Sequence, residues 1–121
     1  MPTPTRDNVY WDHQDILIVA DNIEYLAQRI YDIMEPIAPT TRNQEYSARL
    51  MRVLYQLTDA SSAFHISVQR YDQLSDTLYY LFYLEDTVSL TENTLDGYSQ
   101  EYRVEDEMKA IRYYINELLW T

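Results

Sequence analysis

The chain has 121 residues, of which 46% are apolar, and it contains one glycine, four prolines and no cysteine. This length suits one domain with a single core, the apolar content excludes a disordered chain, and the missing cysteines exclude disulfides and thiolate metal sites. A net charge of −11 disfavours direct binding to nucleic acids, because proteins neutralise phosphates with Lys and Arg.

The scarcity of glycine favours an all-α protein. Sheet-rich folds need turns with positive φ roughly every ten residues, and glycine usually supplies them. Here neither glycine nor proline occurs between Thr40 and Asp96. We therefore expect helices joined by short connections.

The first predicted helix covers residues 12–35. Asp12 or Asp7 is the expected N-cap, and Pro36 ends the helix because the residue before a proline is driven out of the α region. Its apolar residues recur at three- and four-residue steps, which indicates one buried stripe. The stripe comprises Ile16, Val19, Ala20, Ile23, Leu26, Ala27, Ile30, Ile33 and Met34.

The second predicted helix covers residues 42–70. Thr41 and Gln44 resemble a capping box at its start. Ser, Thr and Asp side chains in residues 58–63 compete for backbone hydrogen bonds, so a bend there stays open, although we expect the helix to reach Arg70. Its stripe is Leu50, Val53, Leu54, Leu57, Phe64 and Val68.

The third predicted helix, residues 74–92, contains the sequence YYLFY at 79–83. Leu78, Leu81 and Phe82 fall on one face, and the helix is apolar nearly all round, which indicates burial on more than one side. Tyrosine and phenylalanine also favour sheet, but no second strand is evident to pair with residues 77–84.

The fourth predicted helix covers residues 99–120 and follows a loop around Gly97. A Glu105–Lys109 pair supports it at i, i+4. Its apolar stripe is Val104, Met108, Ile111, Ile115 and Leu118.

Four helices joined by short links predict an up-and-down four-helix bundle. The alternative treats residues 42–92 as one long bent helix, which gives a three-helix protein that would need to dimerise.

The surplus apolar surface of the third helix needs a cover. Three covers are open: a second copy of the chain, a different protein, or the chain's own aromatic side chains. Those aromatics include Trp11, Trp120, Tyr113 and Tyr114. Thirteen tyrosines are more than a core needs, so the sequence indicates a contact-making protein. The candidate residues for a partner or oligomer contact are Tyr79, Tyr80 and Tyr83.

Acidic residues form a candidate electrostatic surface on the first helix. The side opposite its apolar stripe carries Asp21, Glu24, Asp32 and Glu35. Their spacing is comparable to that of phosphates along a nucleic-acid strand, so this side could occupy a basic groove that holds DNA or RNA.

We expect no catalytic residue, no metal site and no cofactor. The two histidines, His13 and His65, lie on different predicted helices, and the Asp residues beside His13 point in different directions. No di-iron, phosphate-loop or catalytic-triad motif can be assembled. His65 with Arg70 is the one pair that resembles a ribonuclease, and a satisfied, partly buried histidine is the favoured interpretation.

These features predict a binding protein that inhibits or regulates a nucleic-acid-handling partner with a basic surface. In size, charge and helicity it resembles the small acidic inhibitors that phages and other mobile elements make against host defence enzymes. The alternatives are a homo-oligomeric adaptor, such as a homodimer through the tyrosine helix, and an immunity or antitoxin protein for a basic toxin. Without a secretory signal or a membrane-spanning run, a cytoplasmic protein without membrane contact is expected.

Overall fold

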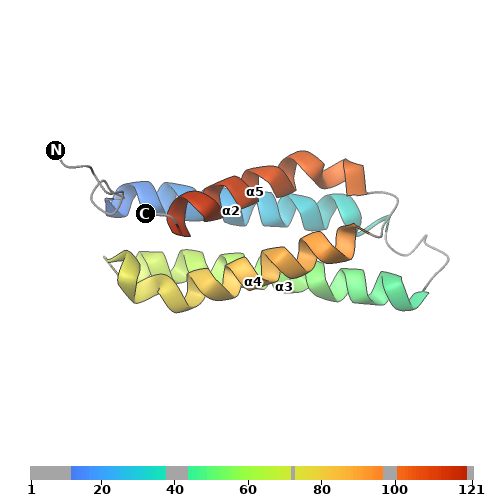
Figure 1. Cartoon of the computed structure of the whole chain (residues 1–121), viewed down its shortest axis with the longest axis horizontal. Coiled ribbons are helices and arrows are strands. Elements are labelled where there is room, and N and C mark those ends of the chain that lie inside the picture. Colours follow the sequence, from blue (N-terminus) through green and yellow to red (C-terminus); the bar gives the residue numbers. More distant parts are fainter. Residues whose placement is uncertain (1–11, 38–43, 72, 97–100, 120–121) are drawn as a thin grey trace.

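Four helices lie side by side in the computed structural model, which describes residues 12–37, 44–71, 73–96 and 101–119 (Figure 1). They are α2 (His13–Met34), α3 (Gln44–Arg70), α4 (Leu78–Leu95) and α5 (Glu105–Leu119). Short 3₁₀ turns, η2 (Leu74–Thr77) and η3 (Glu101–Val104), precede α4 and α5, and no strand occurs in these ranges. The predicted all-α four-helix bundle is confirmed.

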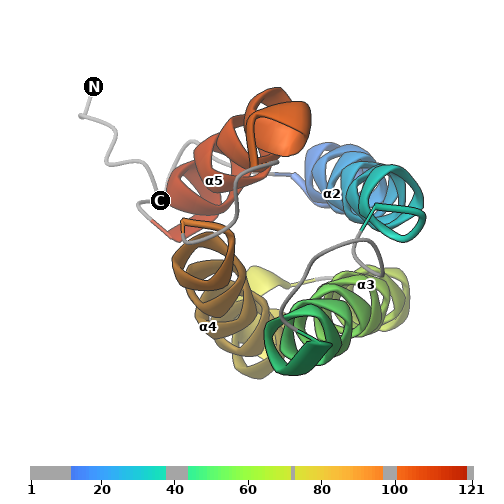
Figure 2. The same ribbon diagram turned by 90° about the vertical axis from the view of Figure 1, so that its right-hand side faces the viewer.

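The helices surround one core, with α2 diagonally opposite α4 and α3 opposite α5 (Figure 2). Neighbouring helices run antiparallel. His13, at the start of α2, hydrogen-bonds through Nε2 to the Val68 carbonyl near the end of α3, at 2.7 Å. Tyr46, at the start of α3, donates to the Thr94 carbonyl near the end of α4. The three-helix alternative is wrong, because α3 ends at Arg70 and a new helix begins at Leu78.

The predicted cap of the first helix is confirmed at Asp12. Its Oδ1 accepts a hydrogen bond from the Asp15 backbone N–H at 2.9 Å, which satisfies one of the free donors of the first turn. The other predicted caps, Asp7, Thr41 and the Gln44 side chain, lie outside the part of the chain whose side chains are described.

Helix α3 runs unbroken through residues 58–63, as expected. The Thr58 hydroxyl donates to the Tyr55 carbonyl at 2.8 Å, and the Ser61 hydroxyl donates to the Thr58 carbonyl at 2.9 Å. These side chains bond to the helix itself, so they do not interrupt it. Ala60 and Ser61 are fully buried here, which holds the segment against the core.

The predicted bounds of the last two helices shift. α4 begins at Leu78 rather than residue 74 and continues past residue 92, because Thr94 and Leu95 extend its buried side. α5 begins at Glu105, after the 3₁₀ turn. The Glu105–Lys109 pair forms at 3.2 Å. The predicted ends of the fourth helix, 99 and 120, lie outside the described residues.

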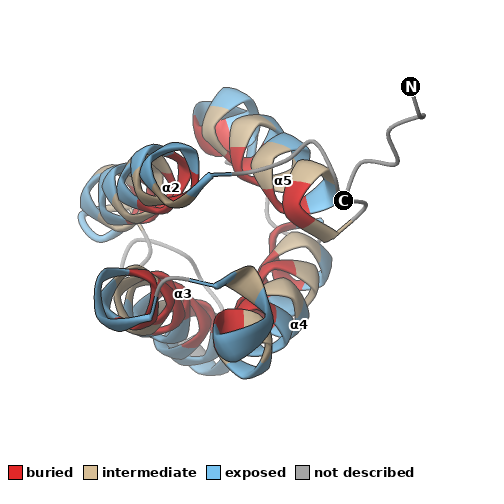
Figure 3. Ribbon diagram, turned by 90° about the vertical axis from the view of Figure 1, so that its left-hand side faces the viewer, coloured by how far each residue is buried: buried red, intermediate tan, exposed pale blue. Residues whose placement is uncertain are grey.

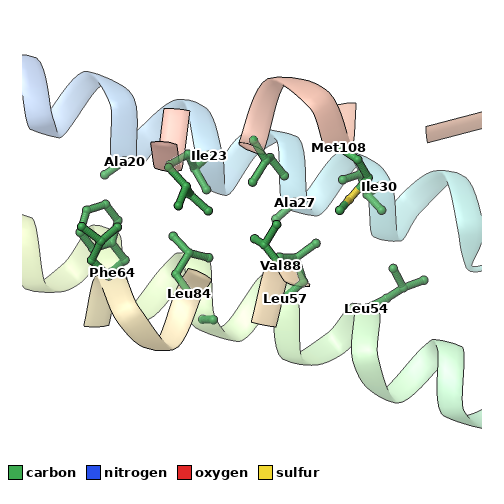
Figure 4. Close-up of a cluster of buried hydrophobic side chains, with 14 of the residues drawn as sticks. Ala20, Ile23, Ala27, Ile30, Leu54, Leu57, Phe64, Leu84, Val88 and Met108 are labelled. Carbon is green, nitrogen blue, oxygen red and sulfur yellow. The ribbon is translucent and has the colours of Figure 1, made fainter. Parts of the chain in front are cut away.

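The core consists of the predicted apolar stripes (Figure 3). Every residue of the predicted α3 and α5 stripes is buried, and in the α2 stripe only Leu26 and Ile33 are partly exposed. Side chains from all four helices meet at the centre of the bundle (Figure 4). They include Ile23, Leu57, Val88 and Met108.

Helix α4 buries an unexpected set of residues. Its inner side holds Leu81, Leu84, Val88 and Leu95 together with three threonines: Thr87, Thr91 and Thr94. Each threonine hydroxyl donates to the carbonyl four residues earlier at 2.8–2.9 Å, so burial leaves no hydroxyl unsatisfied. The expectation that Phe82 shares a face with Leu81 is wrong. The buried side of α4 includes Leu84, which is two residues from Phe82. Two residues along a helix turn through about 200°, so Phe82 points away from this buried side and is 53% exposed.

The two phenylalanines of the chain form a matched pair for a stability test. Phe64 is fully buried, so Phe64→Ala should lower the free energy of unfolding by about 3–5 kcal/mol. Phe82→Ala should change it by about 0.5 kcal/mol or less, because most of the ring is already in water. Urea unfolding followed by far-UV circular dichroism measures both, and similar losses would contradict the described orientation of α4.

Candidate functional site

A row of large side chains lies on the outside of α4. Tyr79 is 77% exposed, Phe82 53%, Tyr83 38% and Leu90 46%. With the exposed Asp86 they follow the spacing i, i+3, i+4, i+7 and i+11, which places them on one side of the helix. These five residues are called the outer stripe of α4. It contains Tyr79 and Tyr83, which the sequence predicted as contact residues. It also contains Phe82 and Leu90, which were not predicted as contact residues.

Tyr80, the third predicted contact residue, has a different environment. It is half-buried and packs against the core. Its ring meets Tyr79 edge to face, with centroids 5.2 Å apart and planes at 88°. Tyr80 therefore packs against both the core and the Tyr79 ring, and less of its own surface is exposed.

The described aromatic side chains of α5 do not cover the outer stripe. Tyr113 is itself 61% exposed, and the Tyr114 hydroxyl accepts a hydrogen bond from Asn22 of α2 at 3.5 Å. Trp11 and Trp120, the other proposed covers, lie outside the described residues. With respect to the described residues alone, the predicted second buried side of α4 is thus exposed at the outer stripe.

Arg112 of α5 fixes the rotation of α4. Its guanidinium donates to Glu92 at 2.7 and 3.1 Å, to Glu85 at 3.1 Å and to the Ser89 hydroxyl at 3.1 Å. Hydrogen bonding to Glu92 is the main cause that raises the pKa of Arg112; the bond to Glu85 adds to it, and partial burial opposes it. Because Glu85, Ser89 and Glu92 share one edge of α4, this network turns the outer stripe toward solvent.

The acidic surface predicted on α2 divides into two parts. Asp21, Asp32 and Glu35 are exposed, whereas Glu24 is half-buried. Asp32 accepts a hydrogen bond from Gln28 Nε2 at 3.0 Å, one turn away on the same helix. Glu24 instead turns toward α3. A partner that approaches this side of α2 would therefore meet three exposed carboxylates, whereas Glu24 is less accessible.

Glu24 bonds to His65 of α3. Glu24 Oε1 lies 2.7 Å from His65 Nδ1, and the His65 side chain is 16% exposed. This agrees with a satisfied, partly buried histidine, although its partner is Glu24 rather than Arg70. Ligand atoms of Asp21, Glu24 and His65 all lie within 4.8 Å of one another. These three residues, the seam cluster, were not predicted as a group from the sequence.

Clefts lined by described residues open between two pairs of helices. One, of about 260 Å³, separates α2 from α3 and is polar. Its lining consists of Glu24, Gln28, Tyr55, Thr58, Asp59 and Ser62. The other, of about 240 Å³, lies between the end of α4 and α5, with Leu95 and Met108 among charged neighbours. Those neighbours are Glu92, Asp96, Glu101, Glu105, Lys109 and Arg112.

Comparison with known proteins finds no matching family, no matching curated protein and no matching solved structure. In the described part of the chain, no helix combines the length and the apolar character needed to cross a lipid bilayer.

The Arg112 network can be tested against an exposed pair on the same helix. Arg112→Ala leaves Glu85 and Glu92 without their shared cation, and it should lower the free energy of unfolding by about 1–3 kcal/mol. Lys109→Ala, which removes the exposed pair with Glu105, should cost about 0.5 kcal/mol or less. Urea unfolding compares the two, and equal losses would exclude a structural role for Arg112.

Proposed function

We propose that the protein is a binding protein that presents the outer stripe of α4 to a protein partner with a basic surface. One observation carries this proposal: α4 turns Tyr79, Phe82 and Leu90 outward while threonines occupy its buried side. Core stability alone would favour the reverse arrangement, because large apolar side chains gain most from burial. A contiguous exposed apolar row is typical of an interaction surface.

The chemistry of the stripe fits recognition of a protein. Tyrosine and phenylalanine are enriched at interfaces, where they supply large, rigid contact area. Spacing of i, i+3, i+4, i+7 is the pattern with which one helix docks into a groove of another protein. Asp86 stands in the middle of the row and adds a charge that can pair with one from the partner.

Charge indicates a basic partner. No lysine or arginine occurs between Tyr71 and Tyr102, a segment that includes all of α4. An arginine of the partner can pair with Asp86 and stack on the neighbouring tyrosine rings. A second copy of the chain is a poorer fit, because a symmetric contact through α4 brings the two copies of Asp86 close together in a protein of net charge −11.

The most common proteins with extended basic surfaces are those that bind nucleic acids. We therefore propose that the partner is a cytoplasmic nucleic-acid-handling protein and that binding inhibits or regulates it. The acidic side of α2 is a candidate mimic of a nucleic-acid strand, through Asp21, Glu24, Asp32 and Glu35. No enzymatic activity and no direct nucleic-acid binding are predicted for the chain itself.

Two exposed tyrosines allow a matched test of the α4 surface. Tyr79 is 77% exposed on α4, and Tyr113 is 61% exposed on α5, outside both proposed contact surfaces. A partner captured from native-host lysate is purified and titrated with each variant by calorimetry. Tyr79→Ala should weaken binding at least about tenfold, as expected for an interface hot spot, and Tyr113→Ala should leave it unchanged.

Equal effects of the two variants would exclude α4 as the contact surface. Self-association of the wild-type protein that Tyr79→Ala abolishes, measured by sedimentation, would assign the stripe to a second copy instead. The mimicry part has its own test. Asp32→Lys with Glu35→Lys should weaken binding and flatten its salt dependence, and an unchanged affinity would remove α2 from the interface while leaving the α4 proposal intact.

A further inference from the structure

We propose that the seam cluster, Asp21, Glu24 and His65, binds one divalent transition-metal ion of the zinc type between α2 and α3. Asp21 and Glu24 are three residues apart on α2, and His65 comes from α3. Their ligand atoms lie within 4.8 Å of one another. The site joins two helices and lies away from the outer stripe of α4. It does not depend on the α4 contact proposed above, although it uses Asp21 and Glu24 of the acidic side of α2.

The donors match such an ion in type and approach it in geometry. Zinc in proteins binds histidine nitrogen and carboxylate oxygen at about 2.0–2.2 Å, so donors around a tetrahedral ion lie roughly 3.4 Å apart. To reach that spacing, Glu24 and His65, now 2.7 Å apart, must separate slightly and the exposed Asp21 side chain must rotate toward them. An imidazole ligand favours zinc and similar transition metals over Mg²⁺ and Ca²⁺, which prefer oxygen donors throughout.

The electrostatics of the cluster favour a cation. Asp21 and Glu24 bring two carboxylates within 4.8 Å of each other. The Asp21 side chain has no hydrogen-bond or ion-pair partner among the described residues. A divalent cation would neutralise both carboxylate charges at once and would remove the repulsion between them.

The seam cluster adjoins the polar cleft between α2 and α3. Of its three donors only Glu24 lines this cleft of about 260 Å³, together with Thr58, Asp59 and Ser62 of α3. Three protein ligands with one open position are the arrangement in which zinc keeps a bound water. An ion held by the seam cluster would therefore have three protein ligands and a fourth position for water.

The test uses the full chain, freed of metal with a chelator and titrated with Zn²⁺ by calorimetry in excess Mg²⁺. The wild-type protein should bind one Zn²⁺ per chain. His65→Gln and Asp21→Asn should each weaken binding at least about tenfold, since even indirect supports of a metal site are worth 10- to 100-fold. His13→Gln and Asp106→Asn remove the only other histidine and an exposed acid of α5, and both should leave affinity unchanged.

Asp21→Asn separates a metal site from the simple Glu24–His65 ion pair, because that pair does not include Asp21. Absence of Zn²⁺ binding, equal affinities in wild type and His65→Gln, or loss of binding in His13→Gln would overturn the proposal. Thermal melting gives a second measurement: Zn²⁺ should raise the wild-type melting temperature and leave that of His65→Gln unchanged. Partner binding measured in chelator keeps this test separate from that of the α4 surface.

Discussion

Each helix of a four-helix bundle can turn only one stripe toward the shared core, and α4 carries more large apolar side chains than one stripe holds. Its inner positions are taken by Leu81, Leu84 and Val88 with three threonines, whose hydroxyls bond back to the helix. The large side chains of α4 that do not fit into the core remain exposed in a row. The outer stripe is therefore a direct consequence of the same packing that forms the bundle.

Most of the fold could be predicted from hydrophobic periodicity. In α2, α3 and α5 the apolar residues recur at three- and four-residue steps and polar residues fill the other positions, so the sequence defines which side is buried. In α4 apolar residues occur all round, and the periodicity has no clear phase. Its rotation is set by contacts from other helices: Arg112 of α5 holds one edge, and Tyr46 of α3 bonds to its final turn. A single sequence does not show such contacts, which is why Phe82 was assigned to the wrong face.

The candidate sites were predictable to different degrees. Tyr79 and Tyr83 could be named because tyrosine in this excess indicates contacts, whereas Tyr80 differs from them only through the rotation of α4. The seam cluster could not be predicted. Glu24 and His65 are 41 residues apart, and their meeting depends on how α2 and α3 are aligned along the bundle axis. The one local signal was that Asp21 and Glu24 lie one turn apart on the same helix.

The acidic groups and the aromatic row act over different distances, which allows them to serve one binding event in sequence. Charge attracts a basic partner across roughly 8–10 Å of salt solution, whereas aromatic contacts form only when the surfaces touch. The net charge of −11 arises outside α3, whose three arginines exceed its two acids, and it comes from many acids, so steering depends little on any single one. A divalent ion in the seam cluster would change that charge by two and would lie beside α2, diagonally opposite α4 (Figure 2). It would therefore stabilise the α2–α3 pair and leave the contact surface of α4 in place, while it neutralises Asp21 and Glu24 on the acidic side of α2.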